Sequence, residues 1–170
     1  NGNTGMCSMF FNNMIAELIA IKNNGNYKEL LLKRALENSS MLSSDVAAGV
    51  DPTYPQVTEI QNAAIMGKGV VMVKYTGSRG KSGANDANAE YIGSLRKLFN
   101  ENNVIWQTSE LGKVDQGGGG TIAYIMANYN MDVVDLGVPV LSMHAPYELV
   151  SKTDVYMTYK AYNVFYNMMP

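Results

Sequence analysis

Asp135-Leu-Gly-Val-Pro-Val-Leu-Ser-Met-His144-Ala-Pro-Tyr-Glu148 carries an apolar run directly into the only histidine of the sequence. The Val, Pro and Leu residues predict a buried strand, and the proline that follows the histidine prevents the backbone from continuing it. A strand end is a common place for a sheet to present a metal-ligating imidazole. The alternative for His144 is a core histidine hydrogen-bonded to a carbonyl group.

Helical and strand-like segments alternate along the rest of the chain. Apolar spacing and strong helix formers predict helices at residues 4–22, 27–38, 87–102, 121–129 and 153–168. Apolar runs predict strands at 41–46, 69–75, 104–108 and 132–136, with a glycine-rich mobile loop at 76–83. Alternation of this kind predicts a single α/β domain in which a mixed sheet is sandwiched between helices.

Composition excludes several classes of function. The 170 residues are 46% hydrophobic and have a net charge of -2, with scattered Lys and Arg, so we expect neither nucleic-acid nor membrane binding. The longest apolar runs are shorter than the roughly 18 to 20 residues that span a bilayer. The single cysteine, Cys7, forms no internal disulfide and has no second histidine to activate it, so we expect a cytoplasmic protein without a thiol nucleophile. Because the chain begins at Asn1 without a methionine, we expect it to be cut from a longer protein.

Asp45 and His144 are the candidate metal ligands. Both are expected near strand ends, and ligands of α/β sheets gather beyond the carboxyl ends of strands. One carboxylate and one imidazole are fewer than the three protein ligands of a catalytic zinc. The alternative for Asp45 is a turn-forming residue.

The run Gly117-Gly-Gly-Gly120 before Thr121 is the candidate binding loop. Free amide groups ahead of a helix attract anions, but the run lacks the residues of a P-loop, and close backbone approach is the simpler explanation. Asp115 lies just before this run and could orient the loop or a bound ammonium group. The alternative is that Asp115 caps the loop. The cationic segment around Lys74 either grips a carboxylate or is a solvated turn, and we interpret its Arg79 and Lys81 as surface residues.

Three motifs, in this order, resemble one known family. They are Leu42-Ser-Ser-Asp45-Val-Ala, Gly118-Gly-Gly-Thr121-Ile and Leu141-Ser-Met-His144. They are similar to the C-terminal half of the catalytic domain of the aminopeptidase I / aspartyl aminopeptidase family of zinc metallopeptidases, in its bacterial branch. The resemblance covers nearly the whole of residues 1–170.

The resemblance implies a zinc exopeptidase-like fold and two zinc ions per complete site. It implies Asp45 as a terminal ligand of one metal and His144 of the other. A peptide substrate is the implied partner, and the family forms homo-oligomers. The substrate-binding residues that we predict are Lys74, Asp115, Gly118, Gly119, Gly120, Thr121 and Met143.

The chain also departs from the family pattern. It has no Glu-Glu pair to supply the general base and a further ligand, so we assign no catalytic residue. We expect the dimerisation domain and the N-terminal catalytic segment to be absent from this chain, and Ala48 and Asp51 stand where aspartyl-type relatives have histidines. We therefore expect an inert part of an aminopeptidase that needs the missing half of its catalytic domain. The alternatives are a non-catalytic truncated paralogue or assembly module, and an anion-binding domain built on the glycine run.

Overall fold

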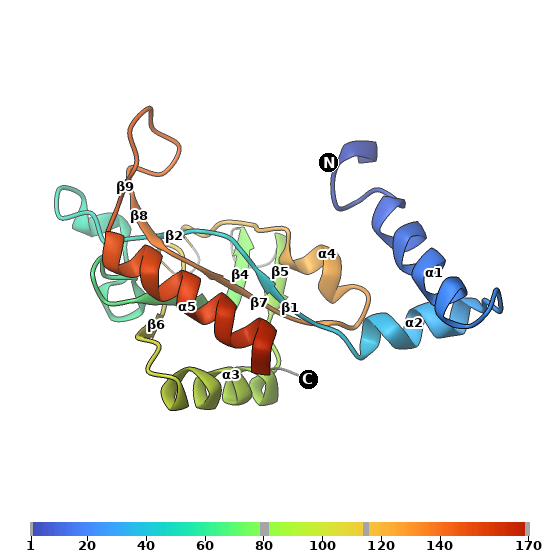
Figure 1. Cartoon of the computed structure of the whole chain (residues 1–170). Coiled ribbons are helices and arrows are strands. Elements are labelled where there is room, and N and C mark those ends of the chain that lie inside the picture. The colour runs from blue at the N-terminus through green and yellow to red at the C-terminus, as the bar shows by residue number, and fades with distance from the viewer. Residues whose placement is uncertain (1, 79–81, 114–115, 169–170) are drawn as a thin grey trace.

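A computed structural model describes residues 2–78, 82–113 and 116–168, and its centre is a mixed sheet (Figure 1). The strand order is β1-β7-β3-β6, with β7 parallel to β1 and antiparallel to β3, and β3 parallel to β6. The bounds are β1 Ser40–Ser43, β3 Val70–Val73, β6 Trp106–Thr108 and β7 Asp132–Gly137. The predicted mixed α/β sheet is therefore confirmed.

Helices cover both faces of this sheet. The helices α3 (Ala89–Glu101) and α5 (Lys152–Met168) pack on one face, where Val134 and Leu136 of β7 join the largest core cluster. The short helix α4 (Ala123–Ala127) packs on the other face against Val133. Side chains of a strand alternate between faces, so Asp135 points to the α4 side, further along β7.

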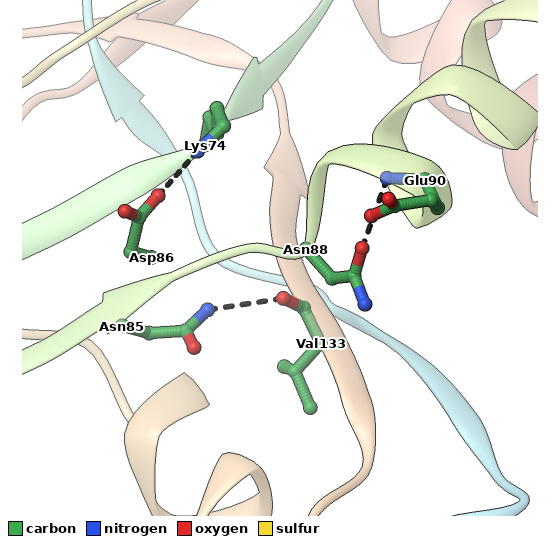
Figure 2. Close-up of polar contacts among 6 residues, drawn as sticks. All are labelled: Lys74, Asn85, Asp86, Asn88, Glu90 and Val133. Carbon is green, nitrogen blue, oxygen red and sulfur yellow. Dashed lines mark hydrogen bonds and ion pairs between the residues drawn. The ribbon is translucent and has the colours of Figure 1, made fainter.

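Two paired strands, which we call the β4–β5 hairpin, overlap the segment 76–83 where the sequence predicted a mobile loop. The strands β4 (Tyr75–Ser78) and β5 (Ser82–Asp86) pair antiparallel. The prediction was wrong because Gly, Ser and Asn have low strand propensity, whereas this pairing depends on backbone hydrogen bonds. Figure 2 shows Asn85 tying the hairpin to β7 through a 3.0 Å hydrogen bond from Nδ2 to the Val133 carbonyl.

The predicted helix at 87–102 begins two residues late, at Ala89, because Asn88 caps it. The Oδ1 of Asn88 accepts a hydrogen bond from the Glu90 amide at 2.9 Å (Figure 2). Asp86, which precedes the predicted helix, is the last residue of β5. An asparagine at this position satisfies an amide group that the first helical turn leaves free.

A smaller sheet continues the main one. The strand β8 (Pro139–Leu141) follows β7 after one residue and pairs parallel with β2 (Ala47–Ala48) and antiparallel with β9 (Leu149–Val150). Short 3-10 helices lie outside the sheets. Their bounds are η1 Gly2–Thr4, η2 Pro55–Val57 and η3 Ile60–Asn62.

The helices α1 (Phe10–Lys22) and α2 (Glu29–Glu37) form an arm that extends away from the sheet (Figure 1). The predicted helix at 4–22 is shorter than expected, because a turn closed by the hydrogen bond from Ser8 N to Gly5 O precedes α1. Large apolar side chains of α1 and of the residue that precedes it are exposed: Met9, Phe10, Met14, Leu18 and Ile21. Within the described part of the chain, no helix combines the length and apolarity needed to cross a membrane.

Candidate functional site

Asp45 lies in the connection from β1 to β2, and close packing holds this connection in place. Its carbonyl oxygen lies so near Gly137 that a Cβ atom at Gly137 would be 1.8 Å from it. The hydroxyl groups of Ser44 and Tyr162 are 2.6 Å apart, and the Tyr162 hydroxyl donates to the Leu136 carbonyl at 2.7 Å. The Asp45 side chain is half-buried, and its Oδ1 accepts from the Val46 amide at 2.9 Å.

His144 lies in the loop at 142–148, which projects from the ends of β8 and β9 (Figure 1). It is exposed, so the alternative interpretation as a core histidine is wrong. Its φ of 67° lies in the left-handed region, and Ser142 has a φ of 58°. Non-glycine residues adopt this region at an energetic cost. Glu148 holds the loop through a 2.6 Å hydrogen bond from the His144 amide to its Oε1.

Asp45 and His144 flank two strands of the smaller sheet that pair with each other, β2 and β8. Asp45 comes two residues before β2 and His144 three residues after β8, and these strands are parallel. Among the described residues, no group of three or more His, Cys, Asp or Glu side chains is placed to hold a metal ion. The two side chains are the right kind of zinc donor but too few for a site. A metal site that they share stays a prediction.

A cleft of about 240 Å³ lies between β4 and the glycine run. Gly119 closes it on one side, because its carbonyl accepts a hydrogen bond from the Gly77 amide at 3.1 Å. A Cβ atom at Gly117 would be 3.3 Å from the Gly112 Cα atom and the Lys113 amide nitrogen, whereas one at Gly119 would meet Cδ2 of Leu111 at 2.2 Å, the end of a side chain that can rotate away. Close backbone approach therefore explains this part of the run. The lining residues are Tyr75, Thr76, Gly77, Glu110, Leu111, Gly112, Lys113, Gly117, Gly118 and Gly119.

A second, smaller cavity of about 30 Å³ shares Thr76, Leu111 and Gly119 with this cleft. Asp135, which is 2% exposed, lies in its wall beside Thr121. The Thr121 hydroxyl donates to Asp135 Oδ2 at 2.9 Å and accepts from the Ala123 amide at 3.2 Å. It therefore ties the glycine run to both β7 and α4.

Burial raises the pKa of the Asp135 carboxyl above its ordinary value. The hydroxyl groups of Ser43, Thr121 and Thr76 act in the opposite direction, and the charge of Asp45 adds to the increase. This acidic group lies beside the start of α4, and the anion-binding interpretation of the glycine run stays a prediction. Sequence reasoning missed Asp135 as a site residue. The available signal was an acid inside the otherwise apolar stretch 133–141.

The other predicted substrate-binding residues are dispersed. Lys74 is exposed and paired with Asp86 (Figure 2), and it borders a neighbouring hollow of about 220 Å³ that includes Glu110. Met143 is half-buried in the same loop as His144, and Gly120 is exposed. Asp115, Arg79 and Lys81 lie outside the described residues.

Comparison with known proteins identifies the family. The model of the family described as aminopeptidase I zinc metalloprotease (M18) matches residues 1–166. The chain therefore belongs to the M18 family of metallopeptidases, as its motifs predicted.

Individual relatives agree with this assignment. A probable M18 family aminopeptidase 1 from Clostridium acetobutylicum is 58% identical over 166 residues, which are 98% of this chain and 35% of that protein. A solved aminopeptidase I structure from the same organism has a TM-score of 0.87 at 56% identity, over 98% of this chain and 35% of that one. The M18 aminopeptidase structure from Thermotoga maritima has a TM-score of 0.92 at 46% identity, over 96% and 36%. The chain thus spans about a third of the length of these relatives.

Proposed function

We propose that this chain is the C-terminal part of the catalytic domain of a zinc aminopeptidase that releases N-terminal residues from peptides. The observation that carries the proposal is the family match over residues 1–166. The glycine-walled cleft supports it, because its backbone amide and carbonyl groups suit a peptide, whose own backbone offers the complementary groups. We also propose a cytoplasmic location and, as in the family, a homo-oligomer.

Asp45 and His144 would each supply one terminal ligand to a pair of zinc ions. The carboxylate retains Oδ2 for this purpose, since the Val46 amide occupies Oδ1. Bound zinc ions supply Lewis-acid polarisation and an acidified water molecule. The remaining ligands and the general base would come from the missing half of the catalytic domain.

The cleft would hold the N-terminal residue of the substrate. At about 240 Å³ it has room for a single residue rather than a long peptide. Gly119 and Thr121 would define its inner wall, because the Thr121 hydroxyl fixes the run against the buried carboxyl of Asp135. Glu110 and Lys113 would place one charge of each sign beside the substrate.

The isolated chain is expected to be inert. Purified chain with added zinc should not hydrolyse aminoacyl p-nitroanilides, because a metal held by one carboxylate or one imidazole is weakly bound and no general base is present. Turnover by the isolated chain that His144→Ala abolishes would contradict this expectation.

A chimera tests the catalytic role directly. In the Clostridium acetobutylicum relative, this chain would replace the matching 166 residues. We expect the chimera to be active, and Asp45→Asn or His144→Ala to lower kcat/KM by roughly 100-fold or more through loss of zinc. Glu29→Gln is the control and should retain activity, because that exposed carboxylate of α2 forms a surface ion pair with Lys33 at 2.9 Å. A folded but inactive chimera would argue against the proposal.

A non-catalytic assembly module is the second candidate, and the apolar surface of α1 favours it. Phe10 and Ile21 are each 73% exposed, which is unusual for large apolar residues on one helix. Under this candidate the chimera is inactive, while the isolated chain self-associates through α1. Light scattering of the chain and of a Phe10→Ser, Ile21→Ser variant distinguishes the candidates.

A further inference from the structure

Three buried oxygen atoms around β7 make no well-formed hydrogen bond among the described residues, although the hydroxyl groups of Ser43 and Thr76 lie close enough to the Asp135 carboxyl to lower its pKa. They are Oδ1 of Asp135, Oγ of Ser43 and Oγ1 of Thr76, which we name the oxygen cluster. Their residues are 2%, 4% and 5% exposed. Buried polar groups are almost always paired, so this cluster indicates a missing partner.

The strand register explains why these atoms lie together. Ser43 of β1 pairs with Asp135 of β7 in parallel register, so both side chains leave the same face of the sheet. Thr76 approaches from the β4–β5 hairpin, and Thr121 binds the other carboxylate oxygen at 2.9 Å. Thr76, Thr121 and Asp135 all line the cavity of about 30 Å³, which has room for one guest of the size of a water molecule.

The charge of the cluster favours a cation over water as this guest. None of the ion pairs found in the described part of the chain includes Asp135, and Asp45 adds negative charge nearby. A buried carboxylate without a counter-charge is strongly disfavoured. A water molecule brings no net charge, whereas a cation attracts all three oxygens.

The ligand set also selects the kind of cation. Carboxylate and hydroxyl oxygens are hard donors, which do not suit a zinc ion that prefers nitrogen and sulfur. One carboxylate is too little charge for calcium, which takes 6–8 oxygen ligands, often several carboxylates. A singly charged ion balances the single carboxylate.

We propose that the oxygen cluster of Ser43, Thr76 and Asp135 binds one small monovalent cation, either an alkali metal ion or ammonium. The bound ion balances the Asp135 carboxylate, which in turn holds Thr121 and the inner wall of the cleft. The site uses neither Asp45 nor His144, and it does not depend on the peptidase proposal.

Thermal unfolding of the chain in different chloride salts tests this proposal. The salts are those of sodium, potassium, ammonium and N-methylglucamine, at a constant ionic strength of about 0.15 M so that screening is equal. We expect at least one small cation to raise Tm by a few degrees in a saturable manner. N-methylglucamine is too large for the cavity and should have no such effect. Equal Tm values in all four salts would overturn the proposal, because a water molecule or a proton then completes the cluster.

Variants locate the effect. Asp135→Asn should abolish the cation dependence of Tm, and Thr76→Val, which keeps the shape but removes one ligand, should weaken binding about tenfold. Asp132→Asn, in the same strand but outside the cluster, should keep the full response. A response that survives both Asp135→Asn and Thr76→Val would place the cation elsewhere. If Asp135→Asn does not fold, Thr76→Val carries the test. None of these measurements needs peptidase activity, so they fail or succeed separately from the chimera.

Discussion

Substitution of Gly137 by alanine should displace the segment that carries Asp45. A Cβ atom at Gly137 would lie 1.8 Å from the Asp45 carbonyl oxygen and 3.2 Å from Cα of Val46. Both neighbours are backbone, so no side-chain rotation relieves the overlap. To reach ordinary contact, the β1–β2 connection must move by roughly 1 Å or more within a close-packed interior.

The cost follows from that displacement. Overpacking of this kind destabilises proteins by about 1–3 kcal/mol, and the upper end applies here because the connection is also held by Ser44 and Tyr162. For a chain of this length, about 3 kcal/mol lowers Tm by roughly 6–12 °C. Urea denaturation monitored by circular dichroism, together with a thermal scan, measures both quantities.

Gly93 provides the matched control. It lies within α3, and none of the described heavy atoms comes within 4 Å of a Cβ atom built there, its own chain neighbours and helix backbone aside. Gly93→Ala should therefore stabilise the protein by about 0.5–1 kcal/mol, since alanine favours the helix. A Gly137→Ala variant that unfolds at the wild-type temperature would refute the argument that close packing of the Asp45 backbone against Gly137 positions Asp45.

Two further predictions concern buried polar groups. Asp154 is fully buried and accepts hydrogen bonds from the amides of Gly67 at 2.6 Å and Gly69 at 2.8 Å, so Asp154→Ala should cost about 3–5 kcal/mol, measured as a lower urea midpoint. An unchanged midpoint would show that water replaces the carboxylate. Burial, with a smaller effect of Asp132, raises the pKa of Tyr91 above its ordinary value of 10.0. Its neutral form is favoured in the folded state, so the stability that it contributes should be lost as pH rises above about 10, and Tyr91→Phe should reduce this alkaline slope of the unfolding free energy.

Much of the fold could be predicted from periodicity. The helix predicted at 153–168 is α5 at Lys152–Met168, and the strand predicted at 132–136 is β7 at Asp132–Gly137. Both predictions succeed because each segment buries one clear apolar pattern in the largest core cluster. The β4–β5 hairpin could not be predicted in this way, because its stability comes from backbone pairing and not from apolar side chains.

The candidate site was only partly predictable. The glycine run was recognised as a place of close backbone approach, and the structure shows such an approach at Gly117, where a Cβ atom would be 3.3 Å from the backbone of Gly112 and Lys113. Asp135 was not recognised, because its spatial neighbours Ser43 and Thr76 are 92 and 59 positions away in the sequence. No local pattern links such distant residues.

The sequence by itself determined the α/β class, through the alternation of helical and strand-like segments, and the family, through short motifs around Asp45, Thr121 and His144. These are local properties, and local spacing is enough to read them. Only the tertiary structure decided which side chains meet. The parallel register of β1 with β7 places Ser43 beside Asp135, and the β4–β5 hairpin brings Thr76 to the cavity that Asp135 lines. The loop after β8 leaves His144 exposed. Strand register and chain crossings depend on the packing of the whole domain, and they determine where a charge is buried and what must balance it.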